Sequence, residues 1–229
     1  MRKSLTNSES VAGNKFQVCK KNRKKYLVIC LALVSTMFLA GCSTAPPKDP
    51  ENICHIFEER RDWWRASKSM RDEWGVPIHV PMAMMYQESS FRSRALPPRK
   101  YVLGFIPWGR VSDAYGYAQA KTMTWDDYIR ETGNRRARRD NFSDAIDFMG
   151  WFITKSHQIN GVSKWDAYAQ YLNYHEGWGG YQRRTYLQKQ WLVDVSRRVD
   201  QRSNTYANQL RSCEERLNRG WFRRLLFGS

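Results

Sequence analysis

Apolar residues recur at the three- and four-residue intervals of an α-helix along most of the chain beyond residue 50. This periodicity predicts a first helix over about residues 52–74. A second helix should start near Pro81, because proline suits the first turn of a helix, and it should carry "MAMMYQES". Further helices are predicted over "TMTWDDYIRETGN", around residues 145–156, over "KWDAYAQYLNYHEG", and from about 183 to 217.

Polar residues mark several ends of these predicted helices. Thr124 with Asp127, and Ser163 with Asp166, have the three-residue spacing of a capping pair at a helix start. Gly133 is expected to end the helix that Thr124 opens, since glycine readily takes the left-handed conformation found there.

The segment 96–120 interrupts the helical pattern with several prolines and glycines, and we expect it to be a long excursion over the surface. Excursions of this length in a compact domain are usually functional or disordered. The chain shows no convincing strand alternation and no internal repeat. The predicted fold class is therefore mostly α, in a single helical domain.

The first forty-two residues have the pattern of a secretory signal. A basic segment runs into the apolar stretch "YLVICLALVSTMFLA", which is short for a membrane span and is followed by "LAGC" ending at Cys42. This ending resembles the bacterial lipobox, which implies cleavage before Cys42 and lipidation of its sulfur. An ordinary N-terminal membrane anchor is the alternative. With Ser43 next, the resemblance implies a lipid-anchored protein on the periplasmic face of the outer membrane.

The domain boundaries follow from that interpretation: a lipoprotein signal peptide at 1–41, a Pro-rich tether at 42–50, and the helical domain at 51–229. The formal charge of the chain is +16. Residues 1–41 hold eight Lys or Arg and one Glu, so the remainder carries +9. A basic surface favours a polyanionic partner, here peptidoglycan or lipid headgroups. Nucleic acid would require a cytoplasmic chain, so no nucleic-acid partner is expected.

The five cysteines divide according to their position. Cys19 and Cys30 leave with the signal, Cys42 takes the lipid, and Cys54 and Cys213 remain near the two ends of the domain. In an oxidising compartment we expect these last two to form a disulfide. The alternative is a pair of buried thiols. The chain has no C-x-x-C or His-rich cluster, so neither a metal nor a cofactor is expected.

Glu88 is the carboxylate of most interest, because it follows the apolar run "VPMAMM" by one helical turn. Burial there would raise its pKa and keep the acid protonated near neutral pH, as a proton donor requires. Alternatively, Glu88 simply emerges into solvent at the helix end.

Three short motifs occur in order along the chain: "QESSF" at 87–91, "AYGYAQA" at 114–120 and "LNYHEGWGGY" at 172–181. Together they resemble the three motifs of the soluble lytic transglycosylase (SLT) catalytic domain, over about residues 75–185. The resemblance implies a lysozyme-like helical fold that acts on peptidoglycan glycan strands. It also implies that Glu88 is the catalytic acid and base. The substrate-binding positions expected at the motifs are Ser89, Gly116, Tyr117, Gln119 and Tyr174, joined by Tyr171 and His175 on the same helix face as Tyr174.

Each motif position has an expected role. Gln119 offers a donor and acceptors to a sugar acetamido group, and Gly116 lets backbone approach a sugar ring. Ser89 is expected to donate to the carboxylate or the substrate. The hydroxyl of Tyr174 would orient Glu88. For the face of the helix that carries this tyrosine, packing against the last helix is the alternative.

The chain departs from the family pattern at two places. Tyr117 and Ala118 replace Leu and Met in the second motif, while its Gln is present. In the third motif His175 stands where the family usually has Asn, and Glu176 follows it. Both side chains can titrate or carry charge, so they bear on specificity at this edge of the site.

The expected reaction is cleavage of the β-1,4 bond from N-acetylmuramic acid to N-acetylglucosamine, with formation of a 1,6-anhydro ring by the single Glu88. One alternative is a muramidase that uses water, with Asp113 or Glu176 as the second carboxylate. The other is a wall-binding lipoprotein without activity.

Three further segments carry weaker expectations. Trp108, within "VLGFIPWGR", is interpreted as a roof over the sugar cleft, with plain packing as the alternative. "RRARR" at 135–139 is read as a solvated loop that meets wall carboxylates or lipid. "WFRRLLFGS" at 221–229 mixes basic and apolar residues and is expected to lie on a membrane surface.

Overall fold

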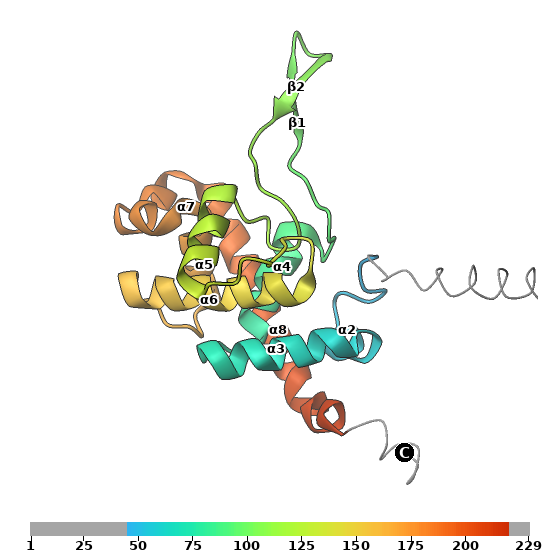
Figure 1. The fold of residues 1–229 in the computed structure, drawn as a ribbon. Helices are drawn as coiled ribbons and strands as arrows, with labels where there is room; N and C mark the ends of the chain where they lie inside the picture. Colours follow the sequence, from blue (N-terminus) through green and yellow to red (C-terminus); the bar gives the residue numbers. More distant parts are fainter. Residues whose placement is uncertain (1–44, 220–229) are drawn as a thin grey trace, which may run out of the picture. The chain divides into compact units, whose positions relative to one another are not determined.

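The computed structural model describes residues 45–219 (Figure 1). The expectations for the signal segment 1–41, for lipidation at Cys42 and for the segment 221–229 fall outside these residues. The elements, in chain order, are α2 (Ile53–Glu59), α3 (Arg61–Trp74), α4 (His79–Ser89), β1 (Arg99–Val102), β2 (Ile106–Arg110), α5 (Thr122–Thr132), α6 (Phe142–Asn160), α7 (Ala167–Gln182), a 3-10 turn η1 (Thr185–Gln188) and α8 (Gln190–Asn218). The mostly helical fold is confirmed.

Helix α6 lies at the centre of the core. Most of its side chains are buried, including Ile146, Phe148, Trp151 and Ile153, which point to different sides of the helix. A helix that is apolar on all sides must be covered on all sides. Accordingly, α6 packs against α3, α4, α5 and α7, while α8 packs against α2, α4 and α7. No helix within residues 45–219 has the length and apolarity needed to cross a membrane.

A disulfide joins α2 to α8. Cys54 and Cys213 are bonded, with their Cα atoms 6.1 Å apart, as expected from the sequence. The side chain of Asn52 caps α2 by accepting hydrogen bonds from the backbone N–H groups of Cys54 and His55. The disulfide therefore ties the start of the domain to its last helix.

The segment predicted as a tether is attached to the helices from residue 45 onward. The Arg60 side chain donates to the carbonyl oxygen of Ala45 at 2.8 Å, and the backbone N–H of Lys48 donates to Glu59 at 3.0 Å. The Tyr206 hydroxyl donates to the carbonyl oxygen of Pro50. Its described part is thus not a free linker.

The excursion at 96–120 contains a two-stranded hairpin, which the sequence analysis did not predict. Strands β1 and β2 are antiparallel, with Tyr101 opposite Pro107 and Val102 opposite Ile106. The hairpin projects from the helices (Figure 1). Its residues 99–109 are all exposed, and Arg110 is half-buried. Neither strand has a core-facing side, so the alternation that usually marks a strand is absent.

Several predicted helix boundaries were wrong. The helix expected over 52–74 is broken at Arg60, whose backbone is not helical (φ −120°, ψ 76°), and the long last helix begins at Gln190 rather than near 183. Thr124 lies inside α5, which starts at Thr122, whereas Gly133 ends that helix in the left-handed conformation as predicted. Asp166, rather than Ser163, caps α7.

Candidate active site

Helix α4 carries Glu88 to the rim of a cleft. The first turns of α4 are buried in the core, and the helix ends at Ser90 in the left-handed conformation. Glu88 lies in the last turn and is half-buried, because it lines a cleft of about 500 Å³. The buried part of α4 therefore places this carboxyl group.

The cleft is built from six parts of the chain. Its lining comprises Glu88 from α4, Pro97, Pro98 and Ser112 at the base of the hairpin, Ala114, Gln119 and Ala120 from the second motif, Lys121, Met123 and Thr124 at the start of α5, Phe148 and Phe152 from α6, and Tyr174, His175, Glu176 and Gly177 from α7. Apolar rings and prolines form much of the wall around the single glutamate of α4.

This environment alters the acidity of Glu88. Burial raises the pKa of Glu88 to about 7, and a hydrogen bond with the Tyr171 side chain opposes the rise. A carboxyl group with such a pKa is partly protonated at neutral pH, so it can both give and take a proton there. The solvated helix-end alternative is therefore wrong for this structure.

The tyrosine that contacts Glu88 is Tyr171, not Tyr174 as expected. The Tyr174 hydroxyl instead donates to the carbonyl oxygen of Ala118 at 2.5 Å. The two residues lie three apart on α7, and Tyr174 lines the cleft, where its ring makes an edge contact with Phe152 (centroids 4.9 Å apart). Both tyrosines thus reach the site, with their expected roles redistributed.

Ser89 and Tyr117 do not face the cleft. Ser89 is buried, and its hydroxyl lies 2.7 Å from the carbonyl oxygen of Tyr117 and 3.2 Å from that of Met85. The prediction that Ser89 donates to the Glu88 carboxylate or to the substrate is therefore wrong, because its hydroxyl donates to the backbone. The ring of Tyr117 is buried against Trp63 and Phe142. Ser89 thus ties the second motif to α4, and the Tyr117 ring packs that motif against α3 and α6.

Gly116 is required for a backbone contact rather than for a sugar. Its φ is +83°, and a Cβ at this position would lie 2.0 Å from the carbonyl oxygen of Arg139. The next residue, Tyr117, donates its N–H to that same oxygen at 3.1 Å. The loop at 135–139 was predicted to be solvated, but its last residue, Arg139, contacts the second motif. The Arg139 side chain turns inward and donates to the carbonyl oxygen of Ala120 at 2.9 Å.

Gln119 lines the cleft and presents one end of its amide to it. The amide nitrogen donates to the carbonyl oxygens of Ala95 and Gly116, at 2.9 and 3.0 Å. Since both partners are acceptors, the orientation of the amide is determined. The amide oxygen is then the atom that can accept a hydrogen bond from a ligand, so the donor half of the expected role is lost.

The end of α7 holds a second carboxylate in an ionised state. Glu176 accepts a hydrogen bond from Lys189 at 2.7 Å and another from the Thr185 hydroxyl. Burial alone would raise the pKa of Glu176, but these bonds and one with His175 lower it to about 2. His175 lies at the cleft edge, and its ring contacts Trp191 at 5.0 Å between centroids.

Two residues considered from sequence lie outside the cleft lining. Asp113 accepts the backbone N–H of Thr122 at 3.0 Å and is exposed. Trp108 is 71% exposed on β2, so it neither roofs the cleft nor packs in the core. Within residues 45–219, no group of three or more His, Cys, Asp or Glu is arranged to hold a metal ion.

Several residues that shape the site could not be assigned to it from the sequence. Phe148 and Phe152 have the spacing of core residues, and one end of that core stripe forms part of the cleft wall. Lys189 gave no sequence signal, because its partner Glu176 is thirteen residues away across η1. Only a folded structure brings these groups to the site.

Comparison with protein families agrees with this arrangement. A family model described as the transglycosylase SLT domain matches residues 30–213, which span most of the chain and include all three motifs. A search of curated proteins found no match.

Proposed function

The chain belongs to the transglycosylase SLT domain family, and from that membership we propose that it is a lytic transglycosylase with Glu88 as its single acid and base. A family of this kind acts on peptidoglycan. The proposed bond is the β-1,4 link from N-acetylmuramic acid to N-acetylglucosamine. The observation that carries the proposal is a cleft carboxyl group whose pKa is raised by burial to about 7.

The proposed reaction has two proton transfers at the same side chain. Protonated Glu88 gives its proton to the bridging oxygen as the bond to C1 of the muramic sugar breaks. The acetamido group of that sugar stabilises the positive charge at C1. The Glu88 carboxylate then removes the proton from the C6 hydroxyl, whose oxygen bonds to C1 and closes the 1,6-anhydro ring. The two steps consume no water, and Glu88 ends protonated as it began.

The surroundings of Glu88 support this double role. Desolvation by the apolar wall favours the protonated form, and the Tyr171 hydrogen bond favours the ionised form. The two effects oppose each other, so neither state is strongly preferred near neutral pH. Gln119 lines the same cleft, and its amide oxygen is suited to accept the N–H of an acetamido group. Lys121 also lines the cleft, where it supplies a cation for the carboxylates of peptidoglycan.

Hydrolysis by a carboxylate pair is the weaker alternative. Glu176 lines the cleft, but its pKa of about 2 and its ion pair with Lys189 make it a poor base for activating water. Asp113 does not line the cleft and caps the start of α5. A single acid and base therefore fits the site better than a pair.

Product analysis tests the proposal. The purified protein should convert peptidoglycan to fragments that end in 1,6-anhydro rings, each lighter by one water than a reducing end, as measured by mass spectrometry. Glu88→Gln should abolish these products, whereas Glu176→Gln, the matched control, should retain them. Reducing ends that vanish in Glu176→Gln would indicate a muramidase. Equal and negligible products from wild type and Glu88→Gln would indicate a wall-binding protein without activity.

We also propose that the enzyme is anchored by a lipid on Cys42 to the periplasmic face of the outer membrane. The proposal rests on the "LAGC" sequence and the basic, apolar segment before it. Mass spectrometry of the N-terminal peptide from the protein produced in a bacterial envelope should find Cys42 at the N-terminus with acyl chains attached. A retained segment 1–41 would refute cleavage at this site.

A further inference from the structure

The tip of the β1–β2 hairpin is an exposed apolar surface that the proposed reaction does not use. We define the hairpin tip as residues 101–109, "YVLGFIPWG". All nine are exposed, with Leu103 at 77%, Phe105 at 73% and Trp108 at 71%. Apolar side chains gathered at the end of a projecting element usually mark a site of interaction. None of them lines the cleft.

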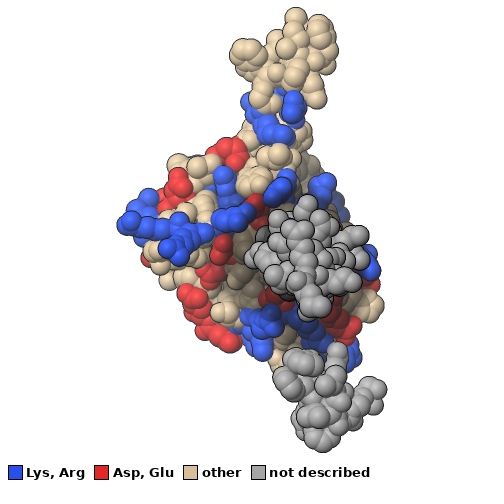
Figure 2. Space-filling model, turned by 45° about the vertical axis from the view of Figure 1, so that its right-hand side comes forward, with Lys and Arg blue, Asp and Glu red and all other residues tan. Residues whose placement is uncertain are grey.

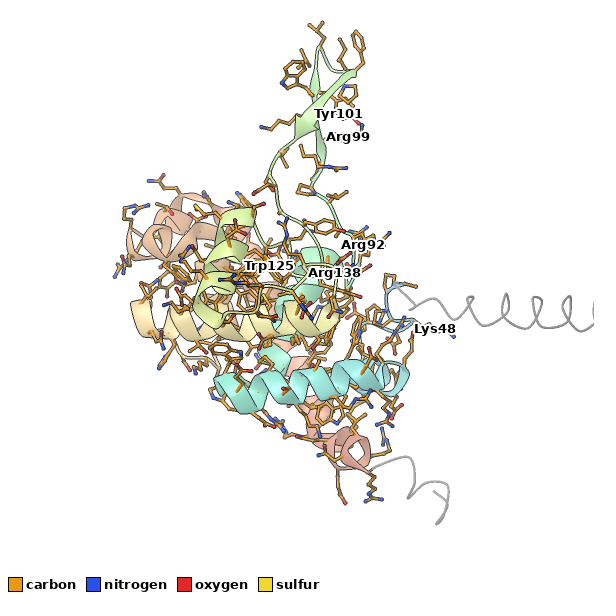
Figure 3. The ribbon with its side chains drawn as sticks, in the orientation of Figure 1. Lys48, Arg92, Arg99, Tyr101, Trp125 and Arg138 are labelled. Carbon is orange, nitrogen blue, oxygen red and sulfur yellow. A yellow bond between two sulfur atoms is a disulfide. The ribbon has the colours of Figure 1, made fainter. Side chains whose placement is uncertain are left out.

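The hairpin is a formed structure rather than a loose loop. Strand pairing joins Tyr101 to Pro107 and Val102 to Ile106. At the base, the backbone N–H of Val111 donates to Pro98 at 3.2 Å, and the Arg110 side chain donates to Pro97 at 2.6 Å. The apolar side chains are thus held beyond the helices, and Figure 3 shows Tyr101 and Arg99 along this projecting ribbon.

Positive charge surrounds the base of the same element. Residues 89–112 hold five Lys or Arg and no Asp or Glu. Arg99, Lys100 and Arg110 flank the hairpin tip directly. Figure 2 shows this arrangement on the surface, with an uncharged end above blue Lys and Arg atoms. Apolar and cationic groups are therefore separated along the axis of the hairpin.

This separation matches the layers of a lipid bilayer. We propose that the hairpin tip inserts into the interface of an anionic phospholipid membrane. Leu103, Phe105 and Trp108 would enter the acyl-chain boundary, where tryptophan and other apolar side chains are favoured. Arg99 and Lys100 would meet the phosphate groups, which attract basic residues close to the surface.

A sugar strand is a less suitable occupant of the tip. Within residues 101–109 the only polar side-chain atoms are the Tyr101 hydroxyl and the Trp108 ring N–H. Recognition of hydroxyl, acetamido and carboxylate groups requires several well-placed polar partners. The tip lacks them, whereas an apolar interface requires none.

The proposed lipid anchor would place the protein close to the same surface. Ala45 is held to the helices by Arg60, and Cys42 is three residues before it. A fully extended chain of that length spans about 10 Å, so an anchored protein stays near its membrane. Insertion of the hairpin tip does not require this anchor, because residues 89–112 alone carry the apolar and basic groups.

Insertion would also orient the active site. The base of the hairpin contributes Pro97, Pro98 and Ser112 to the cleft lining. A strand of five residues reaches about 17 Å. The cleft opening would then lie within about that reach of the membrane surface, so the enzyme would act on the glycan strands nearest to it.

Tryptophan quenching tests the insertion. The full chain is reconstituted into vesicles of phosphatidylcholine and phosphatidylglycerol whose acyl chains carry bromine, a short-range quencher. The chain has ten tryptophans, so Trp108→Phe should remove a quenched component of roughly one-tenth of the emission if each ring contributes equally. Trp165→Phe, which removes a similarly exposed ring away from the hairpin, should leave quenching unchanged. Trp221→Phe separates any contribution from the C-terminal segment.

A charge-reversal variant supplies the second arm. Arg99→Glu with Lys100→Glu should lower the insertion constant by at least about fivefold per charge at low salt, and vesicles of phosphatidylcholine alone should give a similar loss. Circular dichroism melting checks that the variants fold. Equal quenching in wild type and Trp108→Phe would overturn the proposal. So would a Trp108 that is shielded from acrylamide by purified glycan or by an envelope protein but is not quenched in vesicles.

Discussion

Replacing Glu88 with Gln should make the folded protein more stable above neutral pH, although it removes the proposed acid. Glutamine has nearly the shape of a protonated glutamate and carries no charge to desolvate. In the wild type, burial raises the pKa of Glu88 from 4.5 to about 7, so the folded state binds this proton more tightly than the unfolded chain. The free energy of unfolding therefore falls as the pH rises from about 4.5 to about 7, and the loss is complete above that range.

The expected magnitude follows from the same shift. Each pKa unit corresponds to about 1.4 kcal/mol of free energy, so a rise from 4.5 to about 7 is worth about 3 kcal/mol at pH 8. Contact with water in the cleft screens the charge and makes this an upper figure. At pH 4 the carboxyl group is protonated in both states, and the two proteins should differ little.

Urea unfolding of both proteins at pH 4, 6 and 8 measures the difference. Glu176→Gln supplies a control of opposite sign. The pKa of Glu176 is lowered to about 2, so its charge stabilises the fold above about pH 4.5 and this stability is lost as the pH falls toward 2. Glu176→Gln should therefore be less stable than wild type at pH 8. A difference between Glu88→Gln and wild type that does not vary with pH would refute the reasoning.

Three other perturbations have expected outcomes. Replacing Cys54 and Cys213 with Ser should lower the free energy of unfolding by about 2–5 kcal/mol, since the bond joins positions 159 residues apart; in urea unfolding, only the wild type should respond to a reductant. Tyr171→Phe should raise the pKa of Glu88 further, because the lost hydrogen bond lowers it; if Glu88 is the proposed acid, the alkaline limb of the pH–rate profile should move to higher pH, and an unmoved limb would contradict the contact. Gly116→Ala should cost about 3 kcal/mol or more, because its Cβ would meet a backbone oxygen at 2.0 Å. Gly133→Ala is the control, because a Cβ there meets nothing within 4 Å. It should lower the free energy of unfolding by about 1 kcal/mol, and thermal melts of both variants measure the difference.

The helices were predictable where the helical spacing of apolar residues continued over several turns. The central helix α6 and the buried face of α8 follow from spacing alone, because these residues must be covered by the core. The β1–β2 hairpin was not predictable from a period of two, since it has no buried face. The break at Arg60 carries no proline or glycine, so its non-helical backbone had no sequence signal.

The site was predictable at the level of which segments meet, but not of which atoms touch. Sequence placed Glu88 at the end of an apolar helix, and its pKa follows from that burial. The choice between Tyr171 and Tyr174 as its partner depends on the rotation of α7 about its axis, which a three-residue spacing does not define. The ion pair of Glu176 with Lys189 depends on a chain reversal through η1.

The three motifs meet at the backbone of the second one. Ser89 from the first motif donates to the carbonyl oxygen of Tyr117, and Tyr174 from the third donates to that of Ala118. Gln119 then folds back on the carbonyl oxygen of Gly116. These bonds fix the cleft wall beside the acid without contacting a substrate themselves. Ser89 and Tyr174 therefore serve to position this short loop. Gln119 and Ala120 of that loop line the same cleft as Glu88, whose pKa is raised by burial.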